Sequence, residues 1–415
     1  MTGLARRVAA TYCPDGVGEG RLAPMESLGR IYPMFGAAFT DTAARAADRE
    51  ALADGRLIDL GIGAYFPTDP RVIDAAIAAL QGGATRYLDS APLKEAIAAK
   101  YADEQGVGVD AQAQVVLLGG ARAGIMLAML ALVDEGDEVV LADPEYLGLA
   151  HAAAAAGGRV VRAAMRREDD GRLVPDLDVL VSAIGPRTSV VAVTNPGNPT
   201  GHLWSPGELA RRGEAARQAG AVLVVNEVYD RLLLAAGARH TGALAAVGDE
   251  GVIVIGGVAK AYDMTGFHLG WMVAGEDLTA TLSDLRFLTH QAEPPAVSQH
   301  AALAALTPPV RDEHPARSAA LMAANAEATV AALQGLEGVR CPMPAAGQFA
   351  FPYVGGDDQA VAERLKRDAG VCVVPGAAWG QMGRGHLRVA LANPPALHGA
   401  GLDRLRGGLA ARGGR

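Results

Sequence analysis

Lys260 is the residue whose neighbours in the sequence most clearly indicate a chemical role. It lies in the segment 255–271, IGGVAKAYDMTGFHLGW, where a single lysine stands among small, aromatic and hydroxyl side chains. A lysine amine becomes nucleophilic when it is desolvated or placed near another cation. A lone lysine is more often a solvated surface residue, so the segments before it decide between these interpretations.

Two polar segments precede Lys260, and each follows an apolar run directly. Residues 195–201 read NPGNPTG, and their two Asn-Pro steps and two glycines are typical of a rigid turn. Residues 221–229 read AVLVVNEVY and lead a buried strand into Asn226 and Tyr229. Each segment alone is compatible with a structural loop between a strand and a helix. Together they place amide and phenol groups at successive strand ends.

Short β-branched runs alternate with alanine-rich segments of helical length through the middle of the chain. This order predicts an α/β domain with a mainly parallel sheet. The loops at the carboxyl ends of its strands should carry the chemistry. Strands are expected over residues 115–119, 138–143, 159–163, 190–194, 221–225 and 252–256.

The sequence pattern changes after about residue 300. A segment of helical pattern at 314–335 is followed by short apolar runs at 348–354, 371–376 and 386–392. This pattern predicts a smaller α+β domain. The first part of the chain is expected to pack with it, because a chain can return to join its two ends. The predicted division is an N-terminal segment 1–70, a large domain 71–300 and a C-terminal small domain 301–415.

The composition argues against several classes of protein. The chain has 415 residues, half of them hydrophobic, and a net charge of −9, so it offers no basic surface for nucleic acid. Its apolar runs are too short to cross a membrane, and the first residues lack the apolar core of a secretion signal, so a cytoplasmic location is expected. Cys13, Cys341 and Cys372 are isolated from one another and suggest neither a disulfide framework nor a metal site.

The ordered set of polar segments resembles the class I/II aminotransferase family of fold-type I enzymes, which depend on pyridoxal 5'-phosphate (PLP). The resemblance covers nearly the whole chain, from DLGIGAYFPTDP at 59–70 to GHLRVALA at 385–392. It is most specific where NPTG is followed by the pattern KAYxMTGxxLGW, which residues 260–271 match. It implies a large domain with a mainly parallel, seven-stranded type of sheet, an α-amino-acid substrate and a PLP cofactor.

The resemblance assigns one group of residues to the cofactor. Lys260 matches the lysine that holds PLP as a Schiff base and later shuttles the Cα proton as general base and acid. Gly120, Ala121 and Arg122 match the start of a helix that binds the cofactor phosphate, where free amides and the helix dipole favour an anion. Tyr146 matches the aromatic residue that stacks on the pyridine ring. Arg122 and Tyr146 are also compatible with a plain helix start and a core residue.

A second group is assigned to the cofactor oxygen, the substrate and the subunit interface. Asn198 and Tyr229 match the residues that hydrogen-bond the phenolic oxygen of PLP, and Asn198 also lies toward the substrate. Arg388 matches the arginine that clamps the substrate α-carboxylate with its planar fork, although an arginine on a strand can also be structural. Gly63 matches the glycine that lets this carboxylate approach the backbone. Tyr87 matches a tyrosine that reaches the phosphate in the neighbouring subunit, which implies a homodimer with shared sites.

Three positions depart from the family pattern. Asn226 stands where an aspartate normally pairs with the protonated pyridine nitrogen, so the cofactor is expected to be a weaker electron sink. His268 replaces the arginine that grips the phosphate, and a histidine is only partly charged near neutral pH. Gly257 stands where many relatives carry a hydroxyl that binds the phosphate.

These departures leave three functions open. The favoured one is a non-standard reaction in specialised metabolism that follows Cα deprotonation of an α-amino acid. Its candidates are β- or γ-elimination or replacement, cyclisation, and carbon–carbon bond formation, on a substrate such as an S-adenosylmethionine-like amino acid. The alternative is a conventional amino-acid aminotransferase that tolerates Asn226. The third is a binding protein with the PLP fold and no turnover.

Overall fold

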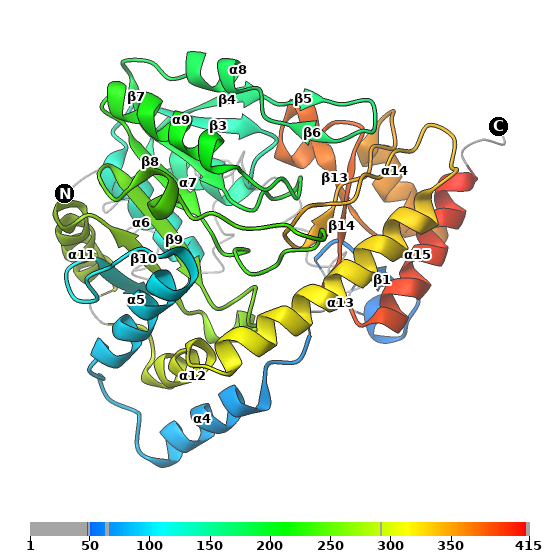
Figure 1. Cartoon of the computed structure of the whole chain (residues 1–415). Helices are drawn as coiled ribbons and strands as arrows, with labels where there is room; N and C mark the ends of the chain where they lie inside the picture. Colours follow the sequence, from blue (N-terminus) through cyan, green and yellow to red (C-terminus); the bar gives the residue numbers. More distant parts are fainter. Residues whose placement is uncertain (1–47, 49, 63–65, 291–292, 412–415) are drawn as a thin grey trace, which may run out of the picture. The chain divides into compact units, whose positions relative to one another are not determined.

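The computed structural model describes residues 48, 50–62, 66–290 and 293–411. Its main sheet has seven strands in the order β2-β10-β9-β8-β7-β3-β4 (Figure 1). β10 pairs antiparallel with β2 and β9, while all other neighbours pair in parallel. The strands are β2 (Val115–Leu118), β3 (Glu138–Asp143), β4 (Arg159–Ala164), β7 (Thr188–Thr194), β8 (Val222–Asn226), β9 (Val252–Gly257) and β10 (Gly270–Ala274).

The predicted α/β class and mainly parallel sheet are therefore confirmed. Each of the six expected strands lies within two residues of its predicted bounds. The antiparallel strand β10 was not predicted. Its residues belong to the motif around Lys260, and the glycine at its start is more typical of a turn than of a strand.

Alternate residues of each strand enter two separate apolar clusters, because successive side chains of a strand point to opposite faces of the sheet. On β9, for example, Val254 belongs to one cluster and Ile255 to the other. The Ile255 cluster includes residues of α6 (Ala121–Leu132), α7 (Leu147–Ala156) and α11 (Glu276–His290). The Val254 cluster includes residues of α5 (Ala91–Gln105), α9 (Pro206–Gln218), α10 (Ala243–Val247) and α12 (Ala296–Leu306). Both faces are thus covered, and polar groups emerge at the strand ends.

The C-terminal part is built on the long helix α13 (Val310–Leu333), beside which α15 (Pro395–Ala410) runs in Figure 1. A three-stranded antiparallel sheet has the order β11-β14-β13. β1 (Ile58–Asp59) pairs in parallel with β12 (Val371–Cys372), which joins the two ends of the described chain. The remaining elements of this part are β11 (Phe349–Ala350), α14 (Asp358–Arg364), β13 (Val374–Pro375) and β14 (Leu387–Ala390).

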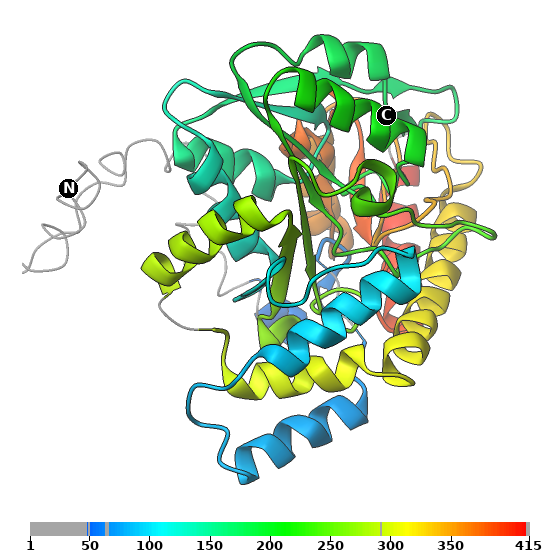
Figure 2. The same cartoon turned by 60° about the vertical axis from the view of Figure 1, so that its left-hand side comes forward.

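Shorter elements complete the described chain. α4 (Pro70–Gln81) lies against α12, and the two helices run side by side in Figure 2. α8 (Leu177–Ser182) and the two-stranded hairpin of β5 (Arg166–Arg167) and β6 (Leu173–Val174) lie between β4 and β7 in the chain. The division at residues 70 and 300 stays a prediction.

Gly270 has the tightest backbone surroundings near the predicted cofactor site. A Cβ atom there would lie 2.6 Å from the amide nitrogen of Ala121 and 2.8 Å from the carbonyl carbon of Gly120. We expect Gly270→Ala to lower the free energy of unfolding by about 3 kcal/mol, because backbone atoms cannot move aside as a side chain can. Urea unfolding measures the change. Gly185→Ala is the matched control, since no atom lies within 4 Å of its added Cβ, and equal losses would contradict the prediction.

Candidate active site

Lys260 lies in the turn that follows β9 at the carboxyl edge of the sheet, and it is half-buried. Its neighbour on the next strand is the end of β8, where Asn226 pairs with Ile255 of β9. In a parallel sheet the carboxyl ends of neighbouring strands meet at one edge. The fold therefore brings the three polar segments singled out in the sequence to the same edge.

Asp263 anchors the Lys260 turn. It has a left-handed backbone (φ 52°), which an aspartate tolerates better than most residues, and its amide donates to the Lys260 carbonyl at 3.4 Å. The buried carboxylate accepts a hydrogen bond from Ser318 Oγ at 2.7 Å and lies 3.0 Å from His314 Nε2. Thr68 Oγ1 donates to the Asp263 carbonyl at 2.6 Å. The turn is thereby tied to α13 and to the segment before α4.

Arg388, Asn198 and Tyr229 form a connected series of side chains. Asn198 Nδ2 donates to the Tyr229 hydroxyl at 3.3 Å, and Arg388 Nη1 donates to Asn198 Oδ1 at 3.2 Å. Arg388 Nη2 also donates to the Gly61 carbonyl at 2.9 Å. These residues come from β14, from the NPGNPTG loop, from the loop after β8 and from the loop after β1. The structure thus brings together three residues that the sequence places far apart.

Two aromatic rings that the sequence analysis missed hold the Arg388 guanidinium. Its central carbon lies 3.9 Å from the Phe349 ring centroid and 4.5 Å from that of Trp379. Arginine stacks on aromatic faces while its in-plane donors stay available. The only sequence signal for these rings is that each belongs to a segment preceding or pairing with the Arg388 strand.

The N-terminus of α6 carries the predicted phosphate residues. Gly120 caps the helix with φ 93°, and no side chain caps the first amides, which begin at Ala121. Arg122 is exposed, and its Nη2 donates to the Tyr146 hydroxyl at 3.0 Å. His268 is exposed and left-handed (φ 46°), and its backbone lies beside Gly120. Helix amides and one guanidinium are therefore available for an anion at this end of the sheet.

Asn226 ends β8 and is almost fully buried, with 2% of its surface exposed. Its Oδ1 atom has no hydrogen-bond partner within the described part of the chain. Such an atom costs about 1–3 kcal/mol when it is left unsatisfied. A hydrogen-bond donor at Asn226 Oδ1 would therefore be stabilising, and the described residues supply none.

Glu227 and His240 are buried behind this edge, 4.0 Å apart between Oε1 and Nε2. Burial raises the pKa of Glu227 to about 8, although its Oε1 accepts a hydrogen bond from the Ala243 amide at 2.7 Å. Burial lowers the pKa of His240 to about 4. Both side chains are therefore predominantly neutral at pH 7.

Tyr87 is not part of this series. Tyr87 is 86% exposed and lines a groove formed by residues 84–88 and 293–299. Gly63 lies outside the described residues, so its predicted contact with the substrate carboxylate stays a prediction.

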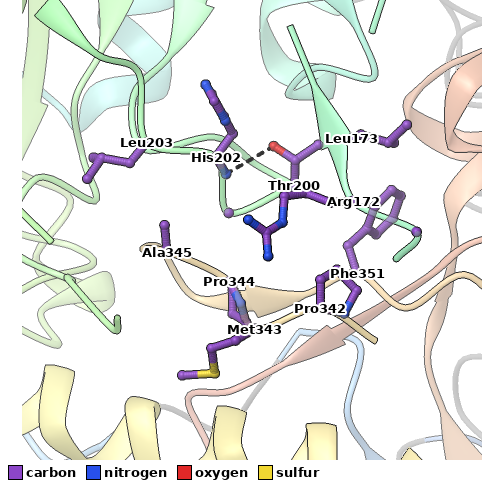
Figure 3. Close-up of a pocket in the computed structure, with 12 residues that line it drawn as sticks. Arg172, Leu173, Thr200, His202, Leu203, Pro342, Met343, Pro344, Ala345 and Phe351 are labelled. Atoms are coloured by element: carbon purple, nitrogen blue, oxygen red, sulfur yellow. Dashed lines mark hydrogen bonds between the residues drawn. The ribbon is translucent and has the colours of Figure 1, made fainter. Parts of the chain in front are cut away.

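A second pocket adjoins the end of the NPGNPTG loop and holds none of the predicted site residues (Figure 3). It lies between residues 171–173, 200–203 and 342–345, and the Thr200 hydroxyl accepts a hydrogen bond from the His202 amide at 3.3 Å. Its lining combines proline, methionine and phenylalanine side chains with Arg172 and His202.

Comparisons with known proteins place the chain in a family. Residues 56–398 match the family model described as aminotransferase class I and II. An aspartate aminotransferase from Geobacillus stearothermophilus is 30% identical over 77% of this chain and 84% of its own length. An arginine–pyruvate transaminase from Pseudomonas aeruginosa is 30% identical over 79% of this chain and 83% of its own length. The solved structure of N-succinyldiaminopimelate aminotransferase from Mycobacterium tuberculosis has a TM-score of 0.83 at 26% identity, covering 92% of this chain and 99% of that one.

The chain belongs to the class I and II aminotransferase family. It has the fold of fold-type I PLP enzymes, and it is an enzyme that depends on PLP. The predicted family, fold and cofactor are thereby confirmed.

The described residues fit this cofactor. PLP presents a phosphate, an aldehyde, a phenolic oxygen and a ring nitrogen. The uncapped α6 amides suit the phosphate, the Lys260 amine suits the aldehyde, and the Asn198–Tyr229 pair suits the oxygen. The unpartnered Oδ1 of Asn226 suits a ring nitrogen that carries a proton.

Within the described ranges, no helix is long and apolar enough to cross a membrane. Over the same residues, no group of three histidine, cysteine or acidic side chains is placed to hold a metal ion. Burial raises the pKa of Cys341 to about 12 and that of Cys372 to about 11, while Cys13 lies outside the described residues.

The raised pKa of Glu227 gives a pH-dependent contribution to stability. The folded protein holds this proton up to about pH 8, whereas the unfolded chain loses it near pH 4.5. The contribution is therefore complete below pH 4.5 and is lost as the pH rises through 8. We expect Glu227→Gln, which stays neutral, to gain stability relative to the wild type across this window, by at most about 1.4 kcal/mol per pH unit.

Urea unfolding at several pH values measures this difference. Glu337→Gln is the control, because Glu337 is exposed. A difference between Glu227→Gln and wild type that stays constant with pH would show that Glu227 is ionised in the folded protein.

Proposed function

We propose that the protein is an amino-acid aminotransferase that transfers the amino group of an α-amino acid to an oxo acid. The observation that carries the proposal is the series Arg388–Asn198–Tyr229. One end of the series suits an α-carboxylate, and the other suits the phenolic oxygen of PLP. A substrate held at Arg388 would thus be aligned with the cofactor by the same connected side chains.

The comparisons support the conventional alternative more than the non-standard reaction favoured from sequence. The relatives named above are an aspartate aminotransferase, an arginine–pyruvate transaminase and an N-succinyldiaminopimelate aminotransferase. Their amino donors differ in charge and length. The substrate side chain therefore stays open, while amino-group transfer is the common reaction.

The proposed roles follow from the chemistry of each side chain. When bound, PLP supplies the electron sink that stabilises negative charge at the substrate Cα. The Lys260 amine holds the cofactor and then moves the Cα proton as base and acid. Arg388 holds the substrate carboxylate with in-plane donors, and its two aromatic neighbours fix the plane of the guanidinium. Asn198 and Tyr229 stabilise negative charge on the phenolic oxygen.

The remaining proposed contacts bind and orient the cofactor. Gly120, Ala121 and Arg122 hold the phosphate, and His268 contributes at its edge. Tyr146 stacks on the ring, in an orientation that its bond with Arg122 supports. Asn226 faces the ring nitrogen.

A non-standard reaction is the second candidate, and Asn226 is the observation that favours it. An amide carries no charge with which to stabilise a protonated ring nitrogen. A weaker electron sink would slow amino-group transfer relative to loss or replacement of a β or γ substituent.

We propose that the active protein is a homodimer in which Tyr87 of each copy reaches the phosphate site of the other. Support comes from the 86% exposure of Tyr87 and from exposed apolar residues on α4 and α11. The exposed large apolar residues of the two helices are Ile73, Ile77, Leu80, Phe287 and Leu288. Burying them against a second copy would remove apolar surface from water, which is favourable. The cytoplasmic location stays a prediction.

The reaction type can be tested without an oxo-acid acceptor. We expect the PLP-loaded enzyme to convert amino donor into oxo acid up to one equivalent per active site and then to stop until an acceptor is added. Lys260→Ala should slow this step by at least about 100-fold, because the proton-transfer group is lost. Lys94→Ala is the control. Continuous release of ammonia or of a side-chain leaving group would instead establish the second candidate.

The shared site can be tested by mixing two inactive variants. We expect Tyr87→Ala and Lys260→Ala to complement each other after subunit exchange, because one site of the mixed dimer then has both wild-type residues. Activity should approach about one quarter of the wild-type value. Sedimentation confirms that mixed dimers form, and mixed dimers without activity would place Tyr87 in its own subunit's site or outside the site.

A further inference from the structure

A buried lysine of α5 is paired with the residue that follows Tyr229. Lys100 has 2% of its surface exposed, and a lysine is almost never buried to this extent unless it is paired. Its Nζ atom donates to Asp230 Oδ2 at 2.5 Å and to Glu104 Oε2 at 2.6 Å. The Glu104 pair lies within α5, whereas the Asp230 pair joins α5 to the turn that carries Tyr229.

Asp230 occupies the middle of the turn after β8. The Glu227 amide, at the start of this turn, donates to a carbonyl of β9 at 2.8 Å. The Asp230 amide donates to the Glu227 carbonyl at 3.1 Å, and the Leu232 amide donates to the Tyr229 carbonyl at 2.9 Å. Because Asp230 shares this hydrogen-bonded turn with Tyr229, a movement of its side chain away from Lys100 would also move the backbone of Tyr229.

Both members of the Lys100–Asp230 pair are ionised in the folded protein. Burial lowers the pKa of Lys100, but the Asp230 and Glu104 carboxylates outweigh burial and hold this pKa well above its ordinary value. Burial raises the pKa of Asp230, but nearby positive charge, led by that of Lys100, outweighs burial and holds this pKa below its ordinary value. The two shifts agree, so the contact is an ion pair between full charges.

The other basic neighbours of Asp230 do not replace Lys100. His240 carries little charge at pH 7, because burial lowers its pKa to about 4. Arg231 lies against Glu104 instead, with 2.5 Å between Nη1 and Oε1. Over the described ranges, Lys100 is the only cation that forms a hydrogen bond with the Asp230 carboxylate. Loss of the Lys100 charge would therefore leave a buried carboxylate without its main counter-charge.

We propose that Lys100 is a positioning residue for the cofactor site: by neutralising Asp230, it keeps the Tyr229 hydroxyl beside Asn198 and the phenolic oxygen of PLP. Removing one member of a buried ion pair leaves the other charge uncompensated, whereas replacing both is often well tolerated. A lone Asp230 carboxylate would turn towards water or take up a proton, and either change releases the turn from α5. The inference rests on the proposed contact between Tyr229 and the phenolic oxygen.

The pH midpoint of the visible absorption of bound PLP tests this proposal without turnover. Tyr229→Phe should raise the midpoint by about one to two pH units, because the hydroxyl no longer stabilises the deprotonated form, whose negative charge lies on the phenolic oxygen. Lys100→Met should raise it by at least about half a unit, because the hydroxyl is displaced. In a Tyr229→Phe background, Lys100→Met should add less than about 0.3 unit, because both changes act through one hydroxyl.

A second change at position 230 separates the positioning role from a general loss of packing. Lys100→Met combined with Asp230→Asn should return the midpoint to within about 0.3 unit of the wild-type value, because no uncompensated charge is then buried. Lys366→Met is the matched control, since it breaks an exposed ion pair with Asp48 and should leave the midpoint unchanged. If Lys100→Met does not fold, Lys100→Gln takes its place, because its amide still donates to Asp230 while the charge is lost.

Two outcomes would overturn this proposal alone. One is a wild-type midpoint in Lys100→Met when Tyr229→Phe shifts it. The other is a shift in Lys100→Met that is equally large in the Tyr229→Phe background or that Asp230→Asn does not reverse. A wild-type midpoint in Tyr229→Phe would overturn both this inference and the proposed placement of Tyr229. A failure of amino-group transfer with the expected midpoints would contradict the proposed function and leave the role of Lys100 supported.

Discussion

Burial of the main sheet on both faces is the constraint on which the site depends. Apolar side chains of the strands alternate between two clusters of helices, so polar side chains find room at the strand ends. Asn226, Thr194 and the Lys260 turn all lie at the carboxyl edge for this reason. The predicted site residues lie at this edge because apolar side chains cover both faces of the rest of the sheet.

The Arg388 side chain connects this edge to the remainder of the molecule. It extends from β14 of the C-terminal sheet, bonds to the loop after β1, and reaches Asn198 on the main sheet's edge. Two aromatic faces hold it without occupying its in-plane donors. A substrate carboxylate bound at Arg388, as proposed, would thus be connected through this side chain to β14, to the loop after β1 and to the loop that carries Asn198.

Local pattern was enough to predict the strands and the polar loops, and the order of those loops was enough to indicate the family. Spacing alone could not show which side chains support the predicted ones. Phe349 contacts Arg388, and Asp263 contacts His314 and Ser318, so each acts through residues far away in sequence that no local pattern indicates. β10 was missed because a short strand that starts with glycine has little β signal of its own. The roles of the predicted site residues stay predictions that the variants above address.

Asp263 has a consequence for anyone who exchanges segments between this protein and its relatives. Its buried carboxylate accepts hydrogen bonds from the Phe66 amide and the Ser318 hydroxyl and contacts His314 of α13. Its backbone carbonyl accepts from Thr68. A chimera that imports α13 without a donor at positions 314 and 318 would leave this buried carboxylate without two of its partners, at a cost of about 1–3 kcal/mol. The Lys260 turn and α13 should therefore be exchanged together, although they lie in different predicted domains.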